Sequence, residues 1–265
     1  AGGGNLIMIP TSRSVNPANS SLQRSFSTSF ILYPAGIQAQ SISVLIPKSN
    51  SLITVAINHI SYGTFKGYDE NAIPTNNYSS SDTWMGLGYS GAIEKLPIRY
   101  GISNQLYYSK LENYSITKLL FSGGLIWQIK KYKTNIGLSI DDVTIQINPV
   151  SDIIKSSPAK YNIGVHKELA YLPLIISIDY LCFNNTKNKD YFISGIFILS
   201  KKISFSWGTS TRKFDQNIKK NILKTIMGSS GAGISYKYDG IVIGYGLYFY
   251  GTGGWTNGLD LSINF

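Results

Sequence analysis

Apolar and polar residues alternate along most of this chain. The pattern is clearest from Gly258 to Phe265, where Leu259, Leu261 and Ile263 are separated by small or polar residues. A period of two is typical of a β-strand with one apolar and one polar face. The same pattern recurs from about residue 23 onward, so the chain is predicted to consist mainly of half-apolar strands.

Turn-forming residues divide the alternating pattern into fourteen candidate strands. We predict strands over 23–33, 36–47, 51–62, 81–92, 97–110, 115–129, 132–147, 159–169, 172–183, 190–200, 202–212, 229–239, 241–250 and 255–265. Short and long connections alternate, as in barrels with short periplasmic turns and longer outer loops. Asp239-Gly240 is a favoured two-residue hairpin, whereas 63–80, 148–158, 184–189 and 213–228 are the expected long outer loops.

The predicted fold class is therefore all-β: a 14-stranded antiparallel transmembrane β-barrel over residues 23–265, preceded by an N-terminal plug segment over residues 1–22. An aromatic residue at the end of the last strand, Phe265, is the expected C-terminal assembly signal. A soluble β-sandwich or adhesin is an alternative, and it would bury Trp127, Phe205 and Trp207 in a core.

The predicted inward positions are small. They are Gly86, Gly88, Gly101, Ser103, Gly208, Gly233, Gly244 and Gly246. Small residues leave space inside a barrel of this size, and we expect something to fill it. The candidate plug combines the apolar residues Leu6, Ile7 and Met8 with Asn16-Pro17-Ala18. A loose periplasmic tail is the alternative, and a secretory signal is expected to have been removed before residue 1.

Composition supports a membrane-facing surface. Charged residues make up 14% and aromatic residues 13% of the chain, whereas soluble domains carry roughly 25% charged residues. No apolar stretch approaches the roughly 20 residues of a membrane helix. The net charge of +10 comes partly from lysines in predicted turns, so we expect basic rims that meet anionic outer-membrane lipids, and no binding of nucleic acid.

The titratable residues suggest no chemistry. His59, His166 and the single Cys182 form no metal-ligand spacing and no recognisable nucleophile motif. Asp141 and Asp142 are neighbours in one predicted strand and are expected to face opposite sides. We therefore expect no catalytic residue, no cofactor and no metal, and interpret the chain as a protein that is not an enzyme.

Several segments resemble a known family. Asn16-Pro17-Ala18 resembles a turn in the N-terminal hatch of the FadL-like superfamily. The runs Tyr62 to Asp69, Ser79 to Asp82 and Tyr108 to Ser115 resemble the PorV/PorQ branch of outer-membrane barrels, which is associated with type IX secretion in Bacteroidota-type Gram-negative bacteria. The chain is short for this branch.

The resemblance implies a protein-binding scaffold for secretion or surface attachment in the outer membrane. Its partners would be the translocon, cargo or surface-anchored proteins. The expected contact loops contain Tyr68 and Asp69, and also Ile218, Lys219 and Ile222, which recur at helical spacing. The alternative is a FadL-like channel for uptake of hydrophobic small molecules, which would need a roomy apolar interior and an opening in the wall.

Overall fold

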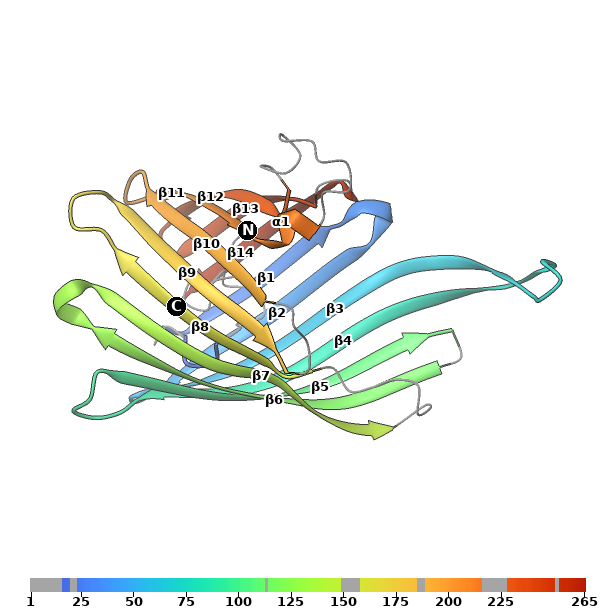
Figure 1. The fold of residues 1–265 in the computed structure, drawn as a ribbon, viewed down its shortest axis with the longest axis horizontal. Helices are drawn as coiled ribbons and strands as arrows, with labels where there is room; N and C mark the ends of the chain where they lie inside the picture. The colour runs from blue at the N-terminus through green and yellow to red at the C-terminus, as the bar shows by residue number, and fades with distance from the viewer. Residues whose placement is uncertain are drawn as a thin grey trace.

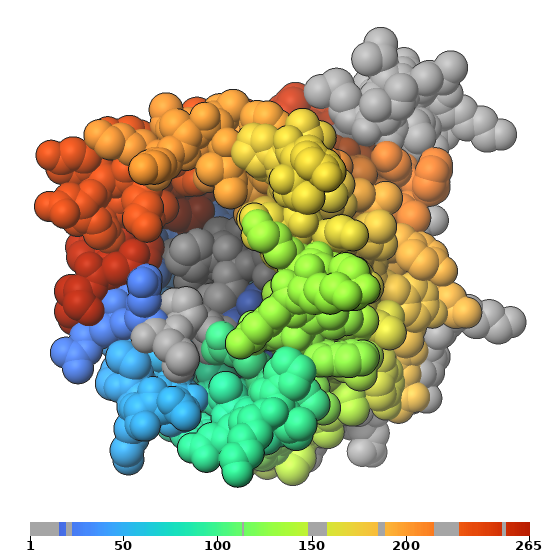
Figure 2. All heavy atoms as spheres, turned by 90° about the vertical axis from the view of Figure 1, so that its left-hand side faces the viewer, coloured from blue at the N-terminus to red at the C-terminus, as the bar shows by residue number. Residues whose placement is uncertain are grey.

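The computed structural model describes residues 16–19, 23–112, 114–148, 158–184, 189–215, 228–250 and 253–265. Within these ranges fourteen antiparallel strands close into a barrel: each strand pairs with its neighbours in the chain, and β1 pairs with β14. Figure 1 shows the strands side on, and Figure 2 shows the colours following the ring in chain order. The prediction of a 14-stranded antiparallel barrel is confirmed.

Except for β3 and β4, which are longer than predicted, the strand bounds agree closely with the predicted ones. They are β1 (Ser25–Leu32), β2 (Gln38–Lys48), β3 (Ser51–Tyr68), β4 (Pro74–Ala92), β5 (Ile98–Leu111), β6 (Tyr114–Ile129), β7 (Thr134–Asn148), β8 (Lys160–Glu168), β9 (Leu174–Phe183), β10 (Lys189–Ile198), β11 (Ile203–Ser210), β12 (Ser230–Tyr238), β13 (Ile241–Phe249) and β14 (Trp255–Asn264). Short helical turns occur at Pro34–Gly36, Lys130–Tyr132 and Arg212–Asp215. Among the described residues, no helix is long and apolar enough to span a bilayer.

The two ends of the barrel differ in their connections. One end carries only short turns, at 49–50, 93–97, 130–133, 169–173, 199–202 and 239–240, while the opposite end carries the long connections 149–159 and 211–229. We call the short-turn end the inner end, as in outer-membrane barrels. Asp239 and Gly240 have φ values of 43° and 83°, the positive angles that a two-residue hairpin needs.

The exterior of the barrel is apolar. Leu87 and Ile102 are 63% and 62% exposed, and Trp127 is 52% exposed. Side chains of this size at such exposure have no core to bury them, so the wall suits hydrocarbon rather than water. Phe205 is also exposed, so two of the three aromatics that a soluble sandwich would bury are on the surface, which contradicts that alternative.

The expected outer loop 63–80 is wrong. β3 continues to Tyr68 and β4 begins at Pro74, so only 69–73 turn. The strands keep pairing across two register shifts, between Ser61 and Gly63 and between Phe65 and Gly67. Such bulges absorb the residues that interrupt the alternation, which explains why the pattern suggested a loop. In Figure 1 this hairpin projects beyond all other strands.

Candidate functional site

Residues Asn16 to Asn19 lie inside the barrel and are held by one asparagine side chain. Asn16 Nδ2 donates to the carbonyl oxygens of Leu125 (3.4 Å) and Leu138 (3.1 Å), which face each other across β6 and β7. Asn16 Oδ1 accepts from the backbone N–H of Ala18 at 2.9 Å, and its backbone oxygen accepts from Asn19 at 3.0 Å. Asn16 and Ala18 are fully buried. We call residues 16–19 the hatch turn.

Two paired glycines make room for the hatch turn. Gly101 of β5 faces Gly124 of β6. A Cβ atom at Gly101 would lie 2.3 Å from the backbone of Pro17, and one at Gly124 would lie 2.0 Å from Asn16 Oδ1. Ala18 packs with buried Ile126 on the same inward face. The hatch turn therefore lies against the wall near the inner end, and it fits there because both wall positions lack a side chain.

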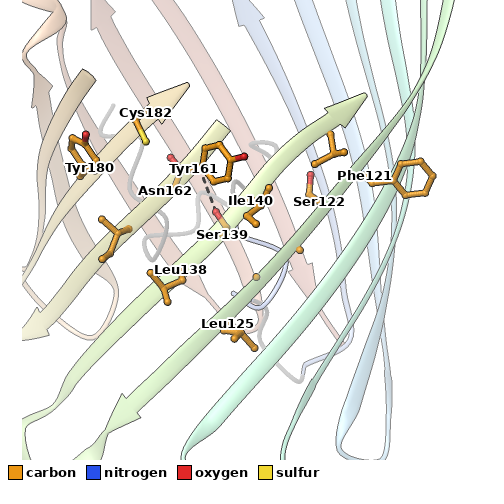
Figure 3. A pocket seen from close by; sticks show the side chains of 14 residues that line it. Phe121, Ser122, Leu125, Leu138, Ser139, Ile140, Tyr161, Asn162, Tyr180 and Cys182 are labelled. Carbon is orange, nitrogen blue, oxygen red and sulfur yellow. Dashed lines mark hydrogen bonds between the residues drawn. The ribbon is translucent and has the colours of Figure 1, made fainter. Parts of the chain in front are cut away.

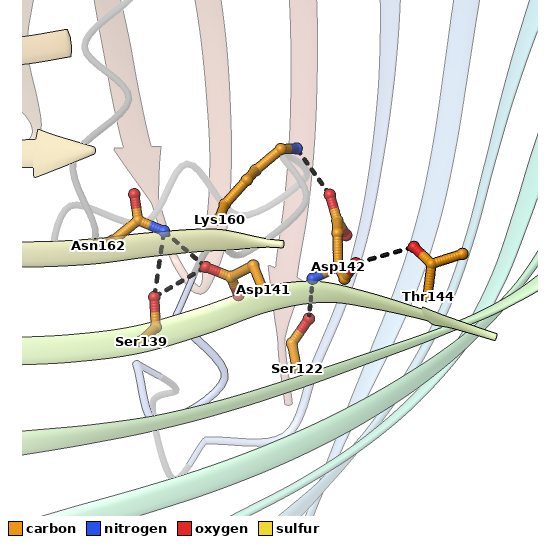
Figure 4. A network of polar contacts seen from close by, with 7 residues as sticks. All are labelled: Ser122, Ser139, Asp141, Asp142, Thr144, Lys160 and Asn162. Atoms are coloured by element: carbon orange, nitrogen blue, oxygen red, sulfur yellow. Dashed lines mark hydrogen bonds and ion pairs between the residues drawn. The ribbon is translucent and has the colours of Figure 1, made fainter. Parts of the chain in front are cut away.

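A polar network lies on the inner surface of β6, β7 and β8 (Figure 4). Lys160 Nζ lies 2.6 Å from Asp142 Oδ2. Asn162 Nδ2 donates to Asp141 Oδ2 at 2.7 Å, and Ser139 Oγ donates to the same oxygen at 2.8 Å. Ser122 Oγ of β6 accepts from the Asp142 N–H at 3.3 Å, so the network joins three strands inside the barrel.

The expectation that Asp141 and Asp142 face opposite sides is wrong, since each is only 6% exposed. The ladder between β6 and β7 shifts register between Phe121 and Gly123, and Asp142 takes a φ of 59°. A bulge places two successive residues opposite one on the partner strand, so both carboxylates turn inward. Within the described ranges, no group of three or more His, Cys, Asp or Glu side chains is placed to hold a metal ion.

Aromatic rings lie on the interior side of β4 and β5, further from the inner end than the hatch turn. The rings of Trp84 on β4 and Tyr107 on β5 lie 5.0 Å apart, and Lys118 Nζ lies 6.0 Å from the centre of the Tyr107 ring. The residues beside Trp84 and Tyr107 on their strands, Met85, Leu106 and Tyr108, are exposed on the outer wall, so alternation turns these two rings inward. Tyr62 joins them because its hydroxyl donates to Asp82 Oδ2 at 2.8 Å.

A second aromatic group lies at the outer rim, where the connections 33–37 and 250–254 meet. The rings of Tyr33 and Tyr250 lie 6.4 Å apart, and those of Tyr248 and Tyr250 lie 4.5 Å apart in an edge-on arrangement. Burial raises the pKa of Tyr250 to about 12 and also raises the pKa of Tyr33. Both phenols are therefore neutral at physiological pH. We call Trp84, Tyr107, Tyr62, Tyr33, Tyr248 and Tyr250 together the outer aromatic cluster.

The histidines and the cysteine are not brought together. His59 Nδ1 lies 2.9 Å from Thr83 Oγ1, between β3 and β4, while His166 is on β8, in another part of the ring. Cys182 on β9 borders a groove on the outer wall. The absence of catalysis stays a prediction.

The other predicted site residues are spread over the two ends. Tyr68 and Asp69 are at the tip of the β3–β4 hairpin, where Asp69 Oδ1 accepts from the N–H groups of Asn71 (2.9 Å) and Ile73 (2.8 Å). Phe265 is at the inner end, and its N–H donates to the Arg24 carbonyl at 3.1 Å. Its role in assembly stays a prediction. Leu6, Ile7, Met8, Ile218, Lys219 and Ile222 lie outside the described residues.

The outer aromatic cluster was missed by sequence reasoning, which stressed the small inward residues. A signal was present, because Trp84 is an even number of residues from Gly86 and Gly88 and therefore shares their face of the strand. Tyr107 likewise shares the strand face of Gly101 and Ser103. On β4 and β5 the inward residues are thus small near the inner end and aromatic further out.

No family model and no curated protein sequence matches this chain. Among solved structures, two described as deletion mutants of the TodX monoaromatic hydrocarbon channel are similar. The deltaS2S3 mutant has a TM-score of 0.58 at 10% identity, with 96% of this chain and 95% of that chain covered. The deltaS2 mutant has a TM-score of 0.54 at 11% identity, with 94% of this chain and 93% of that chain covered. Outer membrane protein Omp33 of Acinetobacter baumannii has a TM-score of 0.52 at 10% identity, with 92% and 98% covered.

At such identities the likeness concerns the fold alone. Three barrels of the outer-membrane type align with nearly the whole chain, and the apolar exterior described above agrees with them. The chain therefore has the fold of an outer-membrane β-barrel.

Proposed function

We propose that this protein is an outer-membrane channel for the uptake of hydrophobic small molecules. The observation that carries the proposal is the outer aromatic cluster inside the barrel. An indole and a phenol with ring centres 5.0 Å apart and planes tilted by 41° offer apolar ring faces that a small hydrophobic molecule can contact. The fold likeness to a protein described as a monoaromatic hydrocarbon channel supports the same substrate class.

The order of features along the interior gives a route. A molecule that enters at the outer rim first contacts Tyr33 and Tyr250 and then reaches Trp84 and Tyr107. The polar network around Asp141 lies on the wall of β7, and the hatch turn lies nearest the inner end. On this route a molecule passes the hatch turn at Gly101 and Gly124 before it is released into the periplasm.

The proposal is tested by titrating toluene into the purified protein in nanodiscs and measuring binding by calorimetry. Trp84→Ala removes one ring of the Trp84–Tyr107 pair, and we expect affinity to fall about 3- to 10-fold. Trp127→Ala is the matched control, because Trp127 is on the lipid-facing wall. Equal affinities for wild type and the Trp84 variant would refute the proposal, as would an equal loss in the control.

A second function is favoured by the projecting β3–β4 hairpin. Tyr68 and Ile73 at its tip are 59% and 58% exposed, and the hairpin extends beyond the other strands (Figure 1). Exposed aromatic and aliphatic side chains on a projection suit a protein partner at the cell surface. A scaffold role in type IX secretion would use this surface, although the neighbours reported above are described as channels or outer-membrane proteins and add no support for secretion.

The scaffold role is tested by affinity isolation from native outer membranes. The full-length protein is compared with a variant in which the hairpin is shortened. The variant keeps Tyr62 and Asp82, because both residues belong to the barrel interior. Recovery of secretion components by the full-length protein alone would support the scaffold. Identical protein recovery from both would exclude the hairpin as the partner site.

A further inference from the structure

Four neighbouring strands, β6 to β9, form an apolar groove on the outer wall of the barrel, with a volume of about 620 Å³. Figure 3 shows labelled side chains from these strands around it. Its outward side chains include Phe121, Leu125, Leu138, Ile140 and Tyr161, which are all among the exposed large apolar residues. The groove therefore opens toward lipid, on the opposite side of the wall from the polar network.

A missing side chain creates the groove. Gly123 is outward by alternation with Phe121 and Leu125, and a Cβ atom at Gly123 would meet nothing within 4 Å. Gly123 pairs with Ile140, next to the bulge that turns Asp141 and Asp142 inward. The wall thus has a depression where the other outward positions carry large apolar side chains.

A basic turn lies at the inner end of β6 and β7, the first two strands of the groove. β6 and β7 are joined by 130–133, which contains exposed Lys130, Lys131 and Lys133. Lys133 forms an ion pair with Glu168, while Lys131 Nζ lies 5.5 Å from the ring centre of Tyr132. Among the lysines of this turn, Lys130 and Lys131 form no ion pair within the described residues. They therefore leave net positive charge where headgroups lie.

The distance between the groove and the turn matches one lipid leaflet. From Gly123 to Ile129 the strand covers about 20 Å at about 3.3 Å per residue. A strand tilt of about 40° reduces this to about 15 Å of depth, which is half of the roughly 30 Å hydrocarbon core. Trp127 lies between the two, at a place suited to an interfacial aromatic.

We propose that this face binds an anionic phospholipid of the inner leaflet, with its phosphate at Lys130 and Lys131 and one acyl chain in the groove at Gly123. The positive charge of the turn favours an anionic headgroup. The depression at Gly123 holds an acyl chain more tightly than the rest of the lipid-facing wall does. The groove is continuous with the lipid-facing surface, so the occupant is a bilayer lipid. The site is independent of transport through the interior.

The test is native mass spectrometry of the whole protein in detergent micelles, with dioleoyl phosphatidylglycerol and dioleoyl phosphatidylcholine as probes. We expect the phosphatidylglycerol to bind at least about tenfold more tightly, because each lysine near the surface contributes about 1 kcal/mol toward anionic lipid. The double variant Lys130→Gln/Lys131→Gln should lose that preference. Gly123→Leu, which fills the depression, should weaken binding of both lipids.

The matched control is Lys201→Gln/Lys202→Gln, which removes another basic pair at the inner end, in the β10–β11 turn. This pair resembles the first because Lys202 Nζ lies 5.5 Å from the ring centre of Tyr238. This control should bind phosphatidylglycerol as the wild type does. Heat-dependent gel migration verifies that each variant is a folded barrel. Equal losses in both lysine pairs, or unchanged binding in Gly123→Leu, would overturn the proposal in favour of general attraction to the rim.

Discussion

Replacing Gly124 with alanine should detach the hatch turn from the barrel wall. The new Cβ atom would lie 2.0 Å from Asn16 Oδ1, so the asparagine side chain has to move by more than 1 Å to reach an ordinary contact of about 3.4 Å. That shift breaks its bonds to Leu125, Leu138 and Ala18. At about 0.5–1.5 kcal/mol for each of the two bonds to the wall, docking weakens by about 1–3 kcal/mol, which lowers the docked-to-undocked ratio roughly 5- to 150-fold.

Hydrogen exchange measured by mass spectrometry reports this change directly. The N–H groups of Ala18 and Asn19 are bonded within the hatch turn, and their exchange should accelerate by a comparable factor, since exchange follows the population of the open state. Gly123→Ala is the matched control, because its Cβ points outward into empty space. Protection that is unchanged in Gly124→Ala, or lost equally in both variants, would show that Asn16 does not hold the hatch turn on the wall.

Three further predictions concern other parts of the barrel. Lys160→Met leaves Asp142 without its ion pair and should lower the free energy of unfolding in detergent by about 1–3 kcal/mol, measured with urea. Tyr250 has a pKa raised from 10.0 to about 12, so its stabilising contribution should disappear between pH 10 and 12; Tyr250→Phe should flatten that part of the stability curve. Asp69→Ala should accelerate hydrogen exchange of the Asn71 and Ile73 amides in the hairpin tip, because both donate hydrogen bonds to the Asp69 carboxylate.

Much of the fold was predictable because barrel strands are read from a short-range pattern. Alternation between lipid-facing and interior residues repeats within each strand, and dipeptides such as Asp239-Gly240 mark the turns. The β3–β4 hairpin was not predicted to its full length, because the bulges near Gly63 and Gly67 interrupt the alternation. A bulge preserves backbone pairing while changing which side a residue faces, and the partner strand needed to recognise it is distant in sequence.

The interior site was only partly predictable. Asn16-Pro17-Ala18 was singled out as a turn, but its contact with Gly101 and Gly124 depends on folding that brings distant segments together. The bulge at Asp142 turned two carboxylates inward, contrary to simple alternation. The pairing of Trp84 with Tyr107 depends on the register between β4 and β5, which no local pattern specifies.

The claim that the barrel admits hydrophobic small molecules is tested most directly by uptake into cells. Radiolabelled toluene is supplied to Gram-negative cells that express the protein, the Trp84→Ala variant or no barrel, and initial accumulation is measured. The account predicts faster uptake with the wild-type protein and a slower rate with the variant. Equal rates in all three strains, with heat-dependent gel migration showing that the barrels are folded, would contradict it.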